Sequence, residues 1–240
     1  MIEKFIYAGS SWAERSYDRP DKNVISTSLA EQWKIGCINI SQAGASTLQN
    51  IDQIKKINSN LPIIWIYNEP ILDLFKITGI LTEEFLNRTD WQDIWNICNQ
   101  YCLKSISDLN RPVLLIGGSS DIVNCNYPNI TIAHESWQKF IAEKSGMTVT
   151  NNKIHVNMYT GGEFLFERCC GADIVHKWMH DYPNIDPPDS MVNSVFNTLQ
   201  FFKKLQNAGW FWEVHPNRLA TEKFADFLLP TVLNFLDAHK

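Results

Sequence analysis

The sequence lacks an excess of basic residues. It contains 21 Lys and Arg against 26 Asp and Glu, so its formal net charge at pH 7 is −5. Proteins that bind nucleic acid neutralise the phosphate backbone with clustered Lys and Arg side chains. The charge balance therefore argues against a nucleic-acid partner and favours a small, neutral or weakly polar one.

Long apolar runs are also absent. No stretch of the sequence reaches the roughly 18 uninterrupted apolar residues that a membrane-spanning helix requires. The opening residues 1–10 contain Glu3 and Lys4 and have none of the features of a signal peptide, which are a basic start, a long apolar middle and a small-residue cleavage site. We therefore expect no membrane span and a cytoplasmic or otherwise soluble protein.

Cysteine is too sparse for a disulfide framework. A chain of 240 residues has only six cysteines, at irregular spacing: Cys37, Cys98, Cys102, Cys125, Cys169 and Cys170. Small disulfide scaffolds have a far higher density. Reduced thiols are the simpler expectation, with Cys98 and Cys102 on the buried face of a helix because they are spaced four residues apart.

What the chain does have is apolar content, at 45% of its residues, enough for one α/β domain spanning residues 1–240 with a sizeable core. Short apolar runs that end in turn residues predict four strands, at residues 5–8, 35–40, 62–67 and 112–116. Helical periodicity follows the second strand through Ile51, Ile54 and Ile57 and recurs at residues 82–109, 136–144, 190–208 and 219–238.

Continuous apolar strands that alternate with helices predict a doubly wound α/β fold, whose mostly parallel sheet is covered on both faces. Residues 148–189 have weak periodicity and many turn residues, including Pro187 and Pro188, and are interpreted as an irregular insertion or lid. In such sheets ligands bind beyond the carboxyl ends of the strands. The loops at those ends are therefore where a site is expected.

These loops contain the residue types that acyl transfer needs. Ser11 follows the first predicted strand, Gly44 lies in the turn after the second, Asn68 ends the third, and His215 precedes the last helix, with Pro216 expected at its first position. Acyl transfer requires a hydroxyl nucleophile, an imidazole to take its proton, and donors for the oxyanion that develops. Ser11 and His215 are the candidate nucleophile and base.

Four short blocks in this order resemble those of the SGNH (GDSL-like) hydrolase family. They are Gly9-Ser10-Ser11, Gln42-Ala43-Gly44-Ala45-Ser46, Ile66-Tyr67-Asn68-Glu69 and Trp212-Glu213-Val214-His215. The resemblance implies a three-layer α/β/α sandwich with a flavodoxin-like sheet. It also implies that Ser11 is the nucleophile and His215 the base, and that the N–H groups of Ser11 and Gly44 and the Asn68 amide form the oxyanion hole.

The chain departs from the family pattern at several positions. The family's Asp, three residues before the His, is Trp212 here, and the nearest acid is Glu213. Either Glu213 orients His215 as the third member of a triad, or the site is a Ser-His dyad in which a backbone carbonyl holds the ring. Ser10 stands where the family has Asp, and Arg15 where it has Gly. Trp12 and Trp212, which flank the proposed Ser11-His215 dyad in the sequence, and Glu69 are expected to line the substrate pocket.

Three other motifs are weaker. The stretch 9–13 nearly matches the Gly-X-Ser-X-Gly elbow of α/β-hydrolases, but that elbow follows a mid-sheet strand and not the first one. Gly117-Gly118-Ser119-Ser120-Asp121 lacks the Gly-Lys-Ser/Thr ending of a phosphate loop. His176 and His180 have a zinc-compatible spacing but no convincing third ligand. We therefore expect neither a metal nor a cofactor.

The sequence thus predicts a serine hydrolase that forms an acyl-enzyme and cleaves a small-molecule ester. Short acyl esters and O-acetyl groups, including those on carbohydrate, are the substrates that the resemblance implies. Two alternatives stay open. One is an O-acyltransferase that uses the same site with a hydroxyl acceptor in place of water. The other is a binding module on the same fold without catalytic activity, which the substitutions at Ser10, Ile66 and Trp212 would permit.

Overall fold

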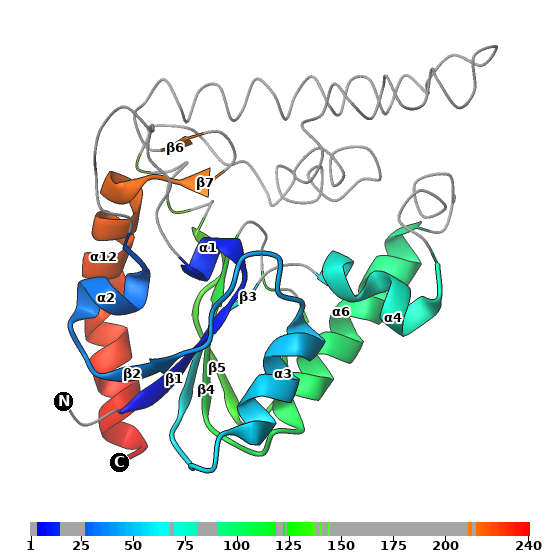
Figure 1. Cartoon of the computed structure of the whole chain (residues 1–240), viewed down its shortest axis with the longest axis horizontal. Helices are drawn as coiled ribbons and strands as arrows, with labels where there is room; N and C mark the ends of the chain where they lie inside the picture. Colours follow the sequence, from blue (N-terminus) through cyan, green and yellow to red (C-terminus); the bar gives the residue numbers. More distant parts are fainter. Residues whose placement is uncertain are drawn as a thin grey trace.

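The computed structural model of the protein describes residues 4–14, 27–67, 70–80, 91–118, 122, 124–137, 140, 144, 211–212 and 215–240. This part of the chain has an α/β fold built on a five-stranded, all-parallel sheet (Figure 1). The strands are β1 (Phe5–Gly9), β2 (Cys37–Asn39), β3 (Ile63–Tyr67), β4 (Val113–Gly117) and β5 (Ile130–His134). Their spatial order is β2-β1-β3-β4-β5, which is the order of flavodoxin-like sheets.

The three central strands are buried along their whole length. Every residue of β1, β3 and β4 is buried, in keeping with their continuous apolar sequences. Parallel strands need such sequences because helices cover both faces of the sheet. These strands are therefore the part of the fold that the apolar runs predicted directly, to within one residue at each end.

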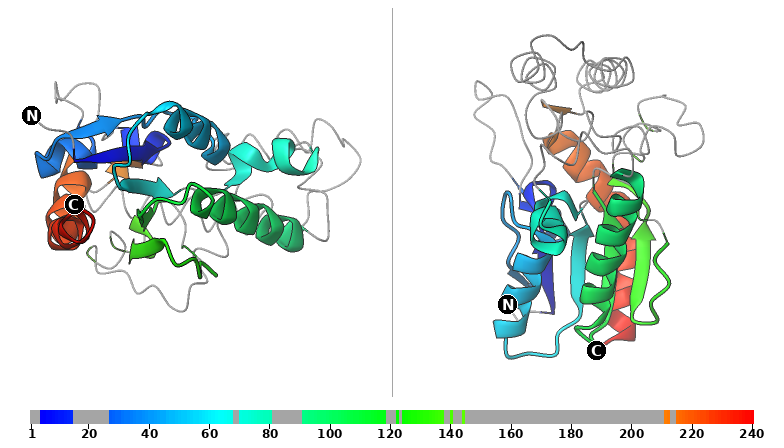
Figure 2. Two further views of the ribbon diagram at one scale, coloured as in Figure 1. Left: turned by 90° about the horizontal axis from the view of Figure 1, so that it is seen from below. Right: turned by 90° about the vertical axis from the view of Figure 1, so that its right-hand side faces the viewer.

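Two hydrophobic clusters lie on opposite faces of the sheet. Phe5 and Tyr7 of β1 pack with residues of α2 (Leu29–Trp33) and α12 (Arg218–Ala238). Their neighbours Ile6 and Ala8 pack with residues of α3 (Thr47–Lys56) and α6 (Trp91–Ser107). Figure 2 shows the helices on both sides of the sheet. The arrangement confirms an α/β fold with a covered parallel sheet and is compatible with three layers.

Three shorter helices and a small second sheet complete the described elements. They are α1 (Ser11–Glu14), the 3-10 helix η2 (Pro70–Asp73), α4 (Leu74–Thr78), and the antiparallel pair β6 (Phe211–Trp212) and β7 (His215–Pro216). Figure 1 shows α1, β6 and β7 at the same end of the five-stranded sheet. This is the end at which β1 stops and the chain enters α1.

Some boundaries differ from the sequence prediction. β5 was not predicted, because its five residues include polar Thr131 and His134 and none of the five is fully buried. Pro216 is not the first residue of the last helix; it lies in β7, and Asn217 caps α12 by accepting a hydrogen bond from Ala220 N at 3.0 Å. The predicted lid at 148–189 and the predicted helix at 190–208 lie outside the described residues.

Cys98 and Cys102 lie on the buried face of α6, as their spacing predicted. The described cysteines, Cys37, Cys98, Cys102 and Cys125, are free thiols. Among the helices that the structure describes, none combines the length and the apolar character that crossing a membrane requires.

Candidate active site

Ser11 is the first residue of α1, and only Ser10 separates it from the carboxyl end of β1. The chain turns sharply here. Gly9 has a φ of +146°, which residues with a side chain disfavour. The carbonyl oxygen of Ser10 then accepts the first helical hydrogen bonds, from Ala13 N at 2.9 Å and Glu14 N at 3.0 Å. Helix α1 packs against β1 and β3. The backbone of Ser11 therefore lies at the carboxyl end of β1, in a helix that packs against β1 and β3, while its side chain is outside the described part of the structure.

Gly44 lies in a tight turn that follows β2. Ala45 N donates to Gln42 O at 3.0 Å, and Gly44, at the third position of this turn, has a φ of +73°. A positive φ at the third position only is the geometry of a type II turn, which favours glycine there. The hydrogen bond of the turn uses groups of its first and last residues, so it does not engage the Gly44 N–H.

Backbone and side-chain hydrogen bonds join this turn to the Ser11 segment. Gln42 N donates to Gly9 O at 3.2 Å, at the end of β1. Ala43 N donates to the Glu14 carboxylate at 2.9 Å, which connects the turn to α1. The structure thus brings together the segments of two residues, Ser11 and Gly44, that are 33 positions apart in the sequence.

A third connection runs through Asn50 on the first turns of α3. Its amide is buried, donates to Ser46 O at 3.0 Å, and lies 3.4 Å from Gly9 N and 3.5 Å from Gly9 O. The two contacts with Gly9 are long and the one with Ser46 is of ordinary length. Asn50 therefore lies between the end of β1 and the end of the Gly44 turn.

His215 belongs to the short sheet at the start of α12. It pairs with Trp212 in the antiparallel register of β6 and β7, and β7 contacts α12. Only residues 213 and 214 separate the two strands. The backbone of His215 thus lies at the same end of the large sheet as α1 (Figure 1), and the side chains of both His215 and Trp212 are outside the described part.

The other predicted site residues, Asn68, Glu69 and Glu213, lie outside the described residues, as do His176 and His180. β3 is described to its last residue, Tyr67, whose carbonyl accepts a hydrogen bond from Gly118 N at 2.9 Å, at the end of β4. On its other side β3 pairs with β1, and Gly9 at the end of β1 is opposite Ile66 of β3. The strands that precede Asn68 and Ser11 in the sequence thus end side by side.

No protein-family model matches the chain, and no curated protein does either. In the part of the chain that the structure describes, no three His, Cys, Asp or Glu side chains gather as they would around a metal ion.

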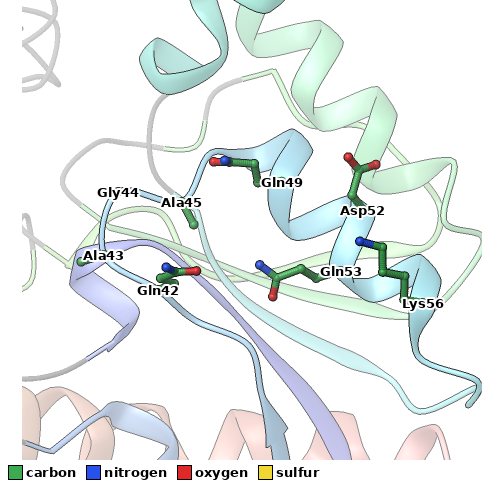
Figure 3. Close-up of a pocket in the computed structure, with 8 residues that line it drawn as sticks. All are labelled: Gln42, Ala43, Gly44, Ala45, Gln49, Asp52, Gln53 and Lys56. Carbon is green, nitrogen blue, oxygen red and sulfur yellow. The ribbon is translucent and has the colours of Figure 1, made fainter.

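A polar pocket of about 280 Å³ lies between the Gly44 turn and α3 (Figure 3). Gln42 from the turn and Gln53 from α3 lie on opposite sides of it. The full lining is Gln42, Ala43, Gly44, Ala45, Gln49, Asp52, Gln53 and Lys56. It contains no aromatic ring and no large aliphatic side chain, so it offers hydrogen-bonding groups and little surface for an apolar acyl chain.

Trp12, predicted as a pocket residue, is buried to 2% exposure in the core. Its ring meets that of Trp137 edge to face, with the centroids 5.8 Å apart, and Trp137 stacks on Phe224 of α12 at 5.0 Å. This aromatic row connects α1 to the helix that follows His215. A contact between Trp12 and a substrate stays a prediction.

Sequence reasoning missed three residues whose side chains connect the segments around Ser11 and Gly44. Glu14 and Asn50 are described above, and the third is Asp73, whose carboxylate accepts hydrogen bonds from Thr47 N and Leu48 N at the start of α3. Asn50 could have been noticed, because it shares a helical face with buried Thr47, Ile51 and Ile54, and a polar residue on an apolar face needs a partner. Asp73 gave a similar signal, since it lies between apolar residues in Pro70-Ile71-Leu72-Asp73-Leu74. Glu14 is half-exposed and gave no signal.

Proposed function

We propose that this chain is a serine hydrolase of the SGNH type that cleaves carboxylic esters through an acyl-enzyme. In this proposal the chain is a single three-layer α/β/α domain, and Ser11 is the nucleophile. The substrate is a small ester with a short acyl group, such as an O-acetyl group on a carbohydrate.

The observation that carries the proposal is the position of Ser11 in the sheet order. The order β2-β1-β3-β4-β5 changes direction between β1 and β3, and Ser11 is the second residue after β1. Open α/β sheets bind ligands beyond the carboxyl ends of their strands at such a switch point. β3, the strand that precedes Asn68 in the sequence, is on the other side of the same switch point in the strand order.

Three further observations support it. The Gly44 turn is hydrogen-bonded to the segment that contains Ser11, which favours a joint role for their N–H groups. The small sheet that contains His215 lies at the same end of the large sheet as α1 (Figure 1). The aromatic row from Trp12 through Trp137 to Phe224 connects α1 with α12, the helix that follows His215.

The proposed reaction starts when His215 takes the proton of the Ser11 hydroxyl and the Ser11 oxygen attacks the ester carbonyl carbon. The N–H groups of Ser11 and Gly44 and the Asn68 amide stabilise the oxyanion of the tetrahedral intermediate. The intermediate collapses, and the departing alcohol takes the proton from His215. His215 then deprotonates a water molecule that attacks the acyl-enzyme. The second tetrahedral intermediate collapses with loss of the Ser11 oxygen, which takes the proton back from His215, so that the acid is released and both residues are restored.

The test is hydrolysis of p-nitrophenyl esters of increasing acyl length by the wild type, Ser11→Ala and Ser41→Ala. Ser41 is a matched control, because it is a serine just after β2 whose hydroxyl donates only locally, to Asn39 at 2.7 Å. We expect Ser11→Ala to lose roughly a thousandfold or more of kcat and Ser41→Ala to keep it.

Full activity in Ser11→Ala would refute the proposal. If the wild type neither hydrolyses any ester nor reacts at Ser11 with a fluorophosphonate probe, the binding-module alternative is favoured. If an acetylated sugar forms from the ester and a sugar acceptor faster than free acetate does, the acyltransferase alternative is favoured.

A further inference from the structure

Asp73 is the only charged residue among the fully buried side chains of the described part of the chain. It is the last residue of η2, at 0% exposure, and its carboxylate accepts hydrogen bonds from Thr47 N at 2.8 Å and Leu48 N at 3.1 Å. These two donors belong to the first turn of α3, 26 and 25 positions earlier in the sequence. Asp73 therefore fixes the start of a helix to which it does not belong.

With Asp73 in place, the donors at the start of α3 are all satisfied. The first residues of a helix have N–H groups without a partner inside the helix. In α3 the Ser46 side chain accepts from Gln49 N, and the Gln49 side chain accepts from Ser46 N, in a reciprocal capping box. The Asp73 carboxylate takes the remaining two, and its negative charge interacts favourably with the helix dipole.

The position of Asp73 is itself defined by α6. The thiol of Cys102 lies 3.9 Å from its carboxylate, and η2 packs against both α3 and α6. Burial and the nearby Asp73 charge raise the pKa of Cys102 far above its ordinary value, so this thiol stays protonated and can donate. The carboxylate thus connects α3 to the interior of the fold.

The start of α3 also determines where the Gly44 turn lies. Ser46, the N-cap, is two residues after Gly44, and Ser46 O accepts a hydrogen bond from Asn50, whose amide faces Gly9 at the end of β1. A shift of this helix start would move Gly44 relative to Ser11. Displacements of about 1 Å among catalytic groups can cost about a hundredfold in rate.

We propose that Asp73 is a positioning residue of the oxyanion hole, whose buried carboxylate holds the first turn of α3 and thereby keeps the Gly44 N–H in register with Ser11. The inference rests on the proposed function. It assigns Asp73 no contact with the substrate. Its effect is therefore expected on the transition state and not on the binding of the substrate in its ground state.

The test compares two pairs of variants with p-nitrophenyl acetate as the substrate. Asp73→Asn replaces one acceptor oxygen by an NH2 group that faces a backbone donor. Asn129→Ala is the comparison, because it removes partly buried side-chain hydrogen bonds to Ser107 O and Arg111 O at the opposite end of the sheet. Thr47→Pro removes one of the two N–H donors to Asp73 and leaves the other, Leu48 N, in place. This backbone can accept proline, because Thr47 is the first residue of α3 and the preceding residue, Ser46, has an extended conformation. Thr47→Ala keeps that N–H.

We expect Asp73→Asn to lower kcat by roughly 30- to 100-fold and Thr47→Pro by roughly tenfold, with KM changed by less than about threefold. The inhibition constant of a trifluoromethyl ketone, whose adduct places an oxyanion in the hole, should rise in proportion to the loss in kcat. Asn129→Ala should lower the urea midpoint of unfolding and leave kcat unchanged, and Thr47→Ala should leave kcat unchanged.

Unchanged kcat in both Asp73→Asn and Thr47→Pro would overturn the inference, and so would a loss in kcat without a matching loss of trifluoromethyl ketone affinity. If Asp73→Asn does not fold, Thr47→Pro against Thr47→Ala decides alone. Failure of the proposed function is a different result, because then Ser11→Ala would retain the activity of the wild type.

Discussion

A Cβ atom at Gly9 would lie 2.8 Å from the carbonyl oxygen of Ile66, across the pairing of β1 with β3. The same atom would lie 2.5 Å from the Ala13 side chain in α1. Both distances are shorter than van der Waals contact allows. The turn that leads into Ser11 thus requires glycine for two independent reasons, the space and the φ of +146°.

Gly9→Ala is therefore expected to destabilise the protein by roughly 3 kcal/mol or more, from backbone strain and overpacking together. Gly79→Ala is the matched control, because Gly79 also has a positive φ, of +72°, but nothing lies within 4 Å of its added Cβ. This control should cost only about 1–2 kcal/mol. Urea unfolding of both variants measures the difference, and equal losses would mean that the crowding at Gly9 has no energetic effect.

The elements that could be predicted from the sequence are those with a local signal. β1, β3 and β4 are buried on both faces and are therefore continuous apolar runs, while α3 and α6 show helical periodicity. β5 is a polar strand with its residues partly exposed, and β6 and β7 have two residues each, too few for any period. Their existence depends on tertiary packing.

The candidate site divides in the same way. Ser11 and Gly44 could be predicted as candidate site residues, because each lies among turn residues that follow an apolar run. The hydrogen bonds of Asp73 to Thr47 and Leu48 leave no trace in sequence spacing, because any buried acid between apolar residues gives the same pattern. The strand order determines which segments such an acid connects, and this order is not visible in the sequence.

The acid that assists His215 can be identified through the register of β6 and β7. Under the proposed function, Glu213→Gln should lower kcat by roughly a hundredfold or more, because a neutral side chain no longer stabilises the imidazolium. Position 212 is directly opposite His215 in the register, and the Cβ atoms of such pairs lie about 5 Å apart. Adding Trp212→Asp to Glu213→Gln should therefore restore part of the rate, whereas adding Trp212→Asn should not.

Steady-state kinetics of these variants gives the answer. An unchanged kcat in Glu213→Gln would leave only the Ser-His dyad, with a backbone carbonyl holding the ring. No gain from Trp212→Asp over Trp212→Asn would contradict the use of position 212 as a place for the acid.

Alkaline pH is expected to destabilise the protein through the thiols of α6. Burial first, and then the Asp73 charge, raises the pKa of Cys98 from 9.0 to about 11. A group whose pKa is higher in the folded state stabilises the fold fully below its unfolded pKa, and this contribution is lost as the pH rises through the folded pKa. The free energy of unfolding should therefore fall between pH 9 and pH 11, by on the order of 2 kcal/mol from Cys98 alone.

Urea midpoints measured from pH 8 to pH 11 test this, with Cys98→Ser as the non-titrating comparison. The variant should show a shallower decline, although not a flat one, because burial and Asp73 also raise the pKa of Cys102. Parallel declines in the wild type and in Cys98→Ser would show that Cys98 does not contribute.

Pro230 lies inside α12, the helix that follows His215 and covers one face of the sheet. Proline has no N–H, so the carbonyl of Asp226 lacks its usual helical donor, and the proline ring crowds that carbonyl. The Pro230 side chain is exposed, so it can be replaced without leaving a cavity. Pro230→Ala should therefore raise the free energy of unfolding by roughly 1–3 kcal/mol.

Asn234→Ala is the matched control for Pro230→Ala, because Asn234 is exposed one turn further along the same helix. It gains only the difference in helix propensity, which is less than about 0.7 kcal/mol. Urea unfolding of the two variants separates the effects. Phe224 and Leu228 precede Pro230 on the buried side of α12. If Pro230→Ala is no more stable than the wild type, a bend at Pro230 must improve the packing of these two side chains on the sheet. That gain in stability must then equal the cost of the missing hydrogen bond.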